Sequence, residues 1–211
     1  MMQSKDKLML IKEKLDILFP STSCFLNHSN DFELLVAVVL SAQAKDEVVN
    51  KVTKDLFSRY KTVEELAEAD YYEVYNLIKL VGLGNTKAKN IIELAKIIHA
   101  KYLDNVPSSR EELTALPGVG NKTASVVRGE LFSLPQIPVD THVNRVMLRL
   151  GIAKKSDTPT SLESKLLKLY KGKDHINFHR QVILFGRNYC KAKSPLCESC
   201  PLVDLCIKKL K

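Results

Sequence analysis

Helix-start signals recur along most of this sequence, and they constrain its fold more than any other feature. In four pairs a capping residue precedes a glutamate by three positions: Asn30/Glu33, Thr62/Glu65, Ser109/Glu112 and Thr160/Glu163. This is the spacing of a capping box at a helix N-terminus. Apolar residues also return at helical intervals, and few stretches alternate as strands do, so we predict an all-α protein of about ten short helices.

One nine-residue stretch, Leu116–Ala124, reads Leu-Pro-Gly-Val-Gly-Asn-Lys-Thr-Ala and predicts a tight turn between two helices. Glycine can adopt positive φ and, having no Cβ, lets another backbone approach closely. Ala124, Val127 and Leu131 fall on one face of the second helix, which we expect to begin near Lys122. Backbone N–H groups at such a turn form an anion site that fits a phosphate, although Gly-x-Gly is in most proteins only a turn.

A second stretch echoes the first. Residues 80–85 read Leu-Val-Gly-Leu-Gly-Asn, and Lys87 follows them as Lys122 follows the later turn. These are either two hairpins of one kind or two unrelated helix ends. Gly82 and Gly151 stand where the C-terminus of a helix favours a left-handed residue. Pro135 and Pro138 break the helical pattern and indicate a seam between domains.

Four of the five cysteines lie close together near the C-terminus, as Cys190-x6-Cys197-x2-Cys200-x5-Cys206. Such a group in an intracellular protein indicates a metal site. Zinc would usually take two Cys-x2-Cys pairs, whereas all-cysteine ligation also suits a [4Fe–4S] cluster, and the spacing alone leaves both open. The remaining cysteine, Cys24, is expected to be a small buried apolar residue.

The composition narrows the partners and the location. The chain has 211 residues, of which 45% are hydrophobic, and a formal net charge of +8. A basic surface favours a polyanion as partner. The sequence has no apolar run long enough for a membrane span, and its N-terminus is too charged for a signal peptide, so we expect an intracellular protein.

Two polar residues at expected helix starts could carry chemistry. The amine of Lys122 lies beside a helix N-terminus, whose partial positive charge favours the neutral, nucleophilic form that can make a Schiff base. Alternatively, Lys122 only contacts a phosphate. Asp140, in Pro138-Val139-Asp140-Thr141-His142, could be an ordinary N-cap. The same carboxylate could also stabilise a developing cation or move a proton, and the two roles are compatible.

Taken together, these motifs resemble those of the endonuclease III family of DNA base-excision glycosylases, and the resemblance extends from about Phe32 to Cys206. The resemblance rests on four motifs in order: Leu40–Asp46 (Leu-Ser-Ala-Gln-Ala-Lys-Asp), Leu116–Ala124, Val139–His142 and the complete four-cysteine spacing.

The resemblance implies two α-helical lobes with DNA bound in a groove between them. One lobe would be a helical barrel of residues 23–134 that carries the helix-hairpin-helix motif. The other would combine residues 1–22 with residues 135–211 and hold a [4Fe–4S] cluster. The ligands of that cluster would be the four spaced cysteines: Cys190, Cys197, Cys200 and Cys206. The hairpin lysine of the family falls on Lys122 and its catalytic aspartate on Asp140.

The family also probes the gap left by an extruded base, with residues that match Gln43 and Leu83. An apolar wedge between base steps holds a kinked duplex open. Further DNA contacts are implied at Gly118, Gly120, Thr123 and His142. This chain departs from the family in two places: Gly84 stands where an aromatic residue commonly follows the wedge, and Asn121 replaces a basic residue often found before the lysine.

The function implied is that of a bifunctional glycosylase and abasic-site lyase that removes oxidised pyrimidines from double-stranded DNA, acting as a monomer. Two other functions stay open at this level. One is a monofunctional mismatch glycosylase of the same superfamily, against which Lys122 argues because such enzymes typically lack the hairpin lysine. The other is a non-catalytic iron–sulfur DNA-binding protein, which would not need both Lys122 and Asp140.

Overall fold

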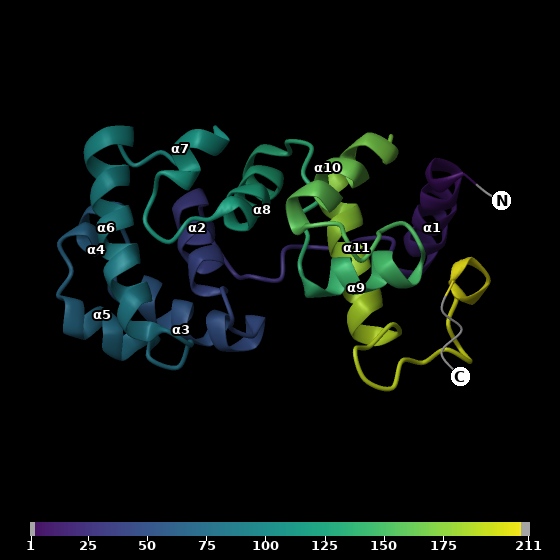
Figure 1. Cartoon of the computed structure of the whole chain (residues 1–211). Coiled ribbons are helices and arrows are strands. Elements are labelled where there is room, and N and C mark those ends of the chain that lie inside the picture. The colour runs from purple at the N-terminus through teal and green to yellow at the C-terminus, as the bar shows by residue number, and fades with distance from the viewer. Residues whose placement is uncertain (1–2, 208–211) are drawn as a thin grey trace. The chain divides into compact units, whose positions relative to one another are not determined.

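The computed structural model describes residues 3–207, and this part of the chain contains eleven α-helices, one short 3-10 helix and no strand (Figure 1). The prediction of an all-α protein is therefore confirmed. None of the helices in the described range is long and apolar enough to cross a membrane. The chain divides into two compact units, residues 24–132 and residues 1–23 with 133–211.

The unit of residues 24–132 contains seven helices: α2 (Asp31–Leu40), α3 (Asp46–Arg59), α4 (Val63–Ala67), α5 (Tyr71–Ile78), α6 (Gly84–Tyr102), α7 (Arg110–Thr114) and α8 (Asn121–Phe132). The other unit contains α1 (Ser4–Leu18), α9 (Thr141–Arg149), α10 (Pro159–Leu169), α11 (His175–Asn188) and the 3-10 helix η1 (Val203–Leu205).

Helix α2 is the centre of its unit. Every residue from Leu34 to Leu40 is buried, with at most 4% of any of them exposed. A helix that is apolar on all sides has to be surrounded, and α3, α6 and α8 all pack against α2. Helix α2 is therefore covered by other helices, and its C-terminal end leads directly to the exposed residues Ala42 and Gln43.

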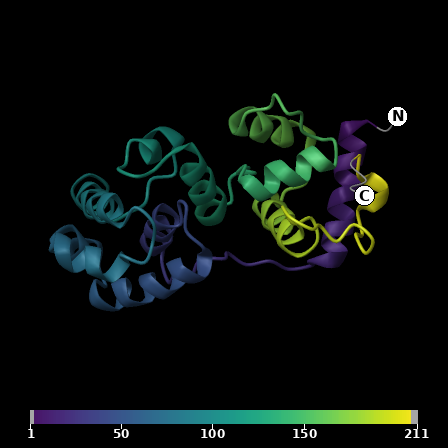
Figure 2. The same ribbon diagram turned by 60° about the horizontal axis from the view of Figure 1, so that its bottom comes forward.

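In the second unit the N-terminal helix packs against helices from the C-terminal half of the chain. Both views show α1 beside α11, and α1 also contacts α10 (Figures 1 and 2). Leu8, Ile11 and Leu15 of α1 are fully buried there. Lys12 is only 7% exposed and pairs with Asp16 on the same helix and with Asp174 at the start of α11.

Three of the four expected N-caps are confirmed. Asn30, Thr62 and Ser109 each accept a hydrogen bond from the backbone N–H of the glutamate three residues later. The fourth was wrong, because α10 begins earlier: Thr158 is its N-cap. Pro159 occupies the first helical position, where its fixed φ suits the helix and its missing N–H is not needed.

The two Gly-rich turns differ in backbone conformation. Gly151 is left-handed as expected, with φ of 72°. Gly82 does not adopt positive φ, so that expectation was wrong, and the left-handed residue of the first turn is Leu83, with φ of 62°. In the second turn it is Gly118, with φ of 78°. The left-handed position thus shifts by one residue between the two turns, and the sequence echo does not extend to the backbone.

Candidate functional site

The turn between α7 and α8 requires glycine at position 118. A Cβ there would lie 3.0 Å from both Val39 Cγ1 and Asn90 Nδ2, and its φ of 78° disfavours any other residue. Arg110 of α7 closes the hairpin from the other side, since its guanidinium donates to the Ser125 hydroxyl at 3.0 Å. The turn is thereby fixed against α2, α6 and α8.

Gly120 has a different environment. Its φ is not in the left-handed region, and a Cβ added there would meet nothing within 4 Å. Its carbonyl accepts the first helical hydrogen bond of α8, from Ala124 N at 2.9 Å. The N–H groups of the next three residues point out of the helix start and are available to an anion. Nothing inside the protein demands glycine here, whereas a closely approaching phosphate would.

Lys122 lies in the first turn of α8 with its side chain exposed, and Thr123 beside it is half-buried. Because the Lys122 side chain is exposed, its amine is accessible to a bound DNA strand. The structure therefore places Gly118, Gly120, Lys122 and Thr123 on one hairpin, as the sequence predicted for the second helix start.

Asp140 is the N-cap of α9. One of its carboxylate oxygens, Oδ1, accepts a hydrogen bond from Val143 N at 2.7 Å. This bond holds the carboxylate at the mouth of the helix and leaves the second oxygen for another partner. Asp140 is partly exposed, so the cap and a chemical role are compatible. It belongs to the unit that contains α9, whereas Lys122 belongs to the unit that contains α8.

His142, two residues further along, has a pKa below that of an ordinary histidine. Burial lowers the pKa of His142 below 6.5, and the positive charges of Arg145 and Arg187 add to this, whereas Asp140 acts in the opposite direction. Arg145 Nη2 lies 3.1 Å from His142 Nδ1 and also donates to the Gly186 carbonyl at 2.9 Å. A neutral imidazole has one donor and one acceptor nitrogen, so His142 can offer either kind of contact.

Gln43 and Leu83 share an unusual backbone conformation. Both are exposed, and both have positive φ, 57° and 62°, although neither is glycine. Such residues cost free energy and persist where the surrounding structure holds them. The two turns are neighbours, because a Cβ on Gly82 would lie 3.7 Å from the Gln43 carbonyl oxygen. The structure thus places the two residues that are expected to probe the gap on adjacent turns, each with a left-handed backbone.

An aromatic residue does stand next to Gly84, although it comes from another helix. A Cβ added to Gly84 would lie 3.4 Å from the ring of Tyr75 in α5. Tyr71, also in α5, donates from its hydroxyl to Asn85 Oδ1 at 3.0 Å. The first turn of α6 is therefore supported from α5 at the position where the family commonly has its own aromatic side chain.

All four C-terminal cysteines line one cavity, together with Arg149 and with apolar and aromatic residues: Leu150, Phe185, Tyr189, Pro195, Leu196 and Leu202. Burial raises the pKa of the Cys200 thiol, and the charges of the other three cysteines raise it further. Within residues 3–207, no three His, Cys, Asp or Glu side chains are arranged to hold a metal ion. Four thiols around one shared cavity fit a larger group with several metal atoms, such as a [4Fe–4S] cluster.

Two arginines of α9 hold the loop that carries these cysteines, and no sequence motif had pointed to them. Arg149 Nη1 donates to the Lys191 carbonyl at 2.7 Å and lies 3.3 Å from Cys190 Sγ. Arg145 Nε donates to the Cys190 carbonyl at 2.9 Å. Arginine is suited to this because its planar fork can bond several carbonyls and still stay charged beside thiolates.

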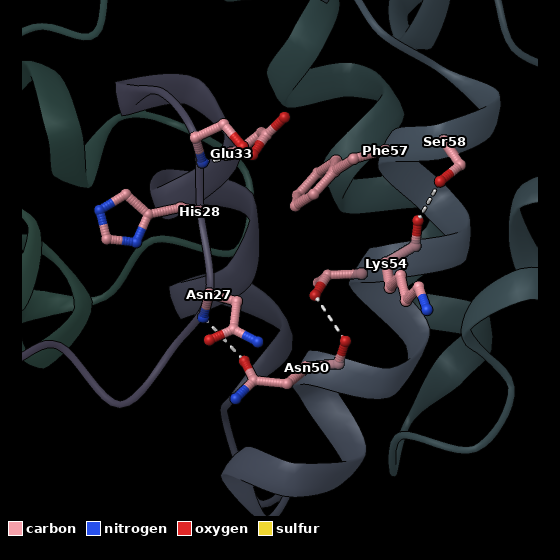
Figure 3. A pocket seen from close by; sticks show the side chains of 9 residues that line it. Asn27, His28, Glu33, Asn50, Lys54, Phe57 and Ser58 are labelled. Carbon is pink, nitrogen blue, oxygen red and sulfur yellow. Dashed lines mark hydrogen bonds between the residues drawn. The ribbon is translucent and has the colours of Figure 1, made fainter.

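A separate hollow in the unit of residues 24–132 lies between the segment before α2 and helix α3 (Figure 3). Its polar groups are largely bonded within the protein: Asn50 Oδ1 accepts from Asn27 N at 2.9 Å, and Glu33 Oε2 accepts from Ser29 N at 2.6 Å. None of the predicted site residues lines it, so the chemistry is expected elsewhere.

Comparison with known proteins agrees with this geometry. Residues 36–172 match the model of the HhH-GPD superfamily base excision DNA repair protein, and residues 190–206 match the iron-sulfur binding domain of endonuclease III. The second match spans the four cysteines and shows that the chain contains an iron–sulfur binding domain.

Named relatives cover nearly the whole chain. Endonuclease III of Bacillus subtilis (strain 168) is 47% identical over 92% of this chain and 89% of the relative. Endonuclease III of Rickettsia conorii (strain ATCC VR-613 / Malish 7) is 47% identical over 89% of each. A solved structure described as "Structure of a Trapped Endonuclease III-DNA Covalent Intermediate: Estranged-Adenine Complex" is similar with a TM-score of 0.91 at 44% identity, covering 98% of this chain and 97% of that one.

Proposed function

The chain belongs to the endonuclease III family of base-excision DNA repair proteins, and we propose that Lys122 and Asp140 carry its chemistry. It is a DNA glycosylase with abasic-site lyase activity that removes oxidised pyrimidines from double-stranded DNA. The observation that carries the assignment of Lys122 is its exposed amine in the first turn of α8, directly after the Gly turn.

The reaction begins with the damaged base turned out of the duplex. The neutral Lys122 Nζ attacks C1′ of the sugar, the glycosidic bond breaks, and the base leaves with the bonding electron pair and takes up a proton. The attacking nitrogen then loses one proton, and the sugar ring opens as the C1′–O4′ bond breaks and O4′ takes up a proton, which leaves a protonated Schiff base. This iminium acidifies the C2′ hydrogen, and removal of that proton expels the 3′ phosphate, which is a β-elimination.

Asp140 acts on the cationic sugar that develops as the base leaves. Its Oδ1 accepts the cap hydrogen bond from Val143 N, and its Oδ2 does not take part in that bond. Oδ2 can therefore stabilise positive charge or move a proton. Its place at the N-terminus of α9 suits a carboxylate, because the helix dipole favours negative charge there. The cap therefore fixes the direction in which the carboxylate points.

DNA is held chiefly through its phosphates and through the gap left by the extruded base. The backbone N–H groups after Gly120 and the hydroxyl of Thr123 receive a phosphate at the start of α8, and Gly118 shapes the turn that presents them. His142 donates from its neutral ring. Gln43 and Leu83 occupy the gap, which fits two exposed side chains on adjacent turns.

The cofactor is a [4Fe–4S] cluster, and Cys190, Cys197, Cys200 and Cys206 are its proposed ligands. When bound, it cross-links four points of the C-terminal loop and contributes charge rather than a step in base removal. The lobe of residues 1–22 and 135–211 would hold it, and residues 23–134 would form the barrel. We place the protein in the cytoplasm, associated with the nucleoid in a prokaryote, where its thiols stay reduced, and expect it to act as a monomer.

The test uses borohydride trapping of the holoprotein on duplex DNA with a preformed abasic site. Wild type should form a covalent adduct, and Lys122→Gln should form none while still binding the DNA, because the backbone donors of the hairpin remain. Adduct formation by Lys122→Gln would show that another amine does the chemistry.

Asp140→Asn separates the two roles of the aspartate. Asparagine also caps a helix, so the thermal midpoint should stay within a few degrees of wild type. Turnover on damaged DNA should fall by roughly 10²–10⁴-fold, the usual effect of a lost acid–base group. A variant that unfolds, or that keeps its turnover, would leave Asp140 with the cap role alone.

A further inference from the structure

Lys87 is a buried cation that none of the roles above uses. It lies in the first turns of α6, four residues after Leu83, and only 4% of it is exposed. Burial lowers the pKa of Lys87. Lysine is rarely buried to this degree without a partner, so its contacts call for an explanation.

The contacts of Lys87 are two backbone carbonyls at the end of the central helix. Its Nζ donates to Leu40 O at 2.8 Å and to Ala42 O at 2.6 Å. Leu40 is the last residue of α2, and Ala42 directly precedes Gln43. The carbonyl end of a helix carries partial negative charge, so an ammonium group is well placed there.

Lys87 is also tied to the turn of Leu83. Its backbone N–H donates to Leu83 O at 3.0 Å, which closes the first turn of α6. The chain of contacts therefore runs from Leu83 through Lys87 to Ala42 and on to Gln43. It links two left-handed residues that lie forty positions apart in the sequence.

We propose that Lys87 is a positioning residue for base extrusion: it fastens the turn of Gln43 to the turn of Leu83, so that both side chains enter the duplex as one rigid unit. This inference rests on the proposed gap-filling role of those two residues. The amine itself does not react, because it is buried and both carbonyls hold it away from solvent.

The inference predicts a defect confined to the step that removes a base from the stack. Lys87→Met keeps the length and apolar stem of the side chain but leaves two carbonyls without their donor. Single-turnover excision of an oxidised pyrimidine from duplex DNA should fall roughly 10- to 100-fold, the scale of a misplaced group. Cleavage at a preformed abasic site, where no base has to leave the stack, should change less than about threefold.

Lys12→Met is the matched control. It removes another buried lysine, in the other unit, that pairs with Asp16 and Asp174. It should lower the thermal midpoint while leaving the ratio of excision to abasic-site cleavage as in wild type. Lys87→Arg, which can still donate to both carbonyls, should recover part of the lost ratio. Should Lys87→Met fail to fold, Lys87→Gln, which cannot reach both carbonyls, takes its place with the same expected fall.

A double-mutant cycle makes the test specific. In a Gln43→Ala background, Lys87→Met should reduce excision by much less than it does alone, because the side chain it positions is already gone. Equal losses on both substrates, an equal ratio change in Lys12→Met, or full additivity with Gln43→Ala would each overturn the inference. Failure of the wild type to cleave abasic DNA would instead overturn the proposed function.

Discussion

At the scale of single residues, the two glycines of the hairpin have different reasons to be glycine. Gly118 is left-handed and is crowded by Val39 and Asn90, whereas Gly120 is neither strained nor crowded within the protein. Two positions that look equivalent in the sequence are thus separated by the structure: one is required by the fold, and the other leaves room for a partner.

Alanine at each position tests this distinction. Gly118→Ala should lower the free energy of unfolding by at least about 1–2 kcal/mol, the cost of a left-handed non-glycine residue. Gly120→Ala should cost under about 1 kcal/mol, as expected at an N-cap. It should nevertheless weaken binding to abasic-site DNA about tenfold, or 1.4 kcal/mol, because its methyl group lies where a phosphate approaches.

Thermal unfolding and DNA titration of the two variants provide the comparison. Stability losses of equal size would contradict the structural argument. Undiminished DNA affinity in Gly120→Ala would show that the open side of this glycine does not face DNA.

At the scale of elements, the C-terminal loop is held to α9 by polar bonds as well as by the apolar residues around its cavity. Arg145 and Arg149 of α9 donate hydrogen bonds to its backbone carbonyls. Cys206 N donates to Val203 O within the loop, and Cys206 Sγ donates to Arg149 O. The four cysteines themselves are only half-buried around their cavity. We expect the loop to depend on the cluster for part of its order, as small metal domains generally do.

Removal of one proposed ligand should show that dependence. Cys197→Ala is expected to lose the brown colour and most of the iron, and to give much less folded protein. Cys24→Ala is the control, since Cys24 lies in the other unit and outside the four-cysteine spacing, and it should retain full iron. A Cys197→Ala protein that stays folded with normal iron content and DNA affinity would contradict the assignment.

A cluster of polar side chains around Asp174 also joins helices of the unit that contains α1. Burial would by itself raise the pKa of Asp174, but hydrogen bonds from Tyr170, Lys12 and Asn177 outweigh it and lower the pKa to about 2. The group links α1, the end of α10 and the start of α11. It is part of what holds an N-terminal helix to a C-terminal half that is distant in sequence.

The lowered pKa of Asp174 predicts that the stability of the fold depends on pH under acidic conditions. Because the folded-state value lies below the ordinary 3.8, the contribution of Asp174 to stability is full above about pH 4 and disappears as the pH falls through 2. The difference in thermal midpoint between wild type and Asp174→Asn should therefore narrow over this range. A constant or widening difference would show that the charge of Asp174 is not what stabilises the group.

At the scale of the whole molecule, the charge of the chain matches its substrate. The formal net charge is +8, and a basic protein that binds phosphates releases counterions. Affinity for DNA should therefore fall steeply as salt increases, with a linear dependence of log Kd on log salt concentration. A flat salt dependence would show that the basic surface does not dock the DNA.

The expected groove between two lobes remains a prediction. Lys122, Gln43 and Leu83 belong to the unit of residues 24–132, whereas Asp140, His142 and the cysteines belong to the other. The proposed reaction therefore needs residues from both units. The turnover of Asp140→Asn and the trapping of Lys122→Gln together test whether both residues act on one reaction.

Much of the site lies in short segments and was therefore predictable. The start of α8 beside Lys122 and the cap at Asp140 each depend on residues within a turn or two, and the four cysteines all lie between residues 190 and 206. Local geometry of this kind is set by capping and by helical periodicity, which a sequence displays directly. The same holds for three of the four N-caps.

The rest required tertiary structure, because it depends on contacts between residues far apart in the chain. The sequence alone determined an all-α protein with a Gly turn before a lysine, an aspartate at a helix start and a cysteine group for a metal. Only the packed structure placed Lys87 against carbonyls 45 and 47 residues away, and Arg149 against the loop of Cys190, 41 residues away. It also decided that Leu83 rather than Gly82 is left-handed, since packing around a turn, and not the glycine content of its sequence, determines which residue takes the strain.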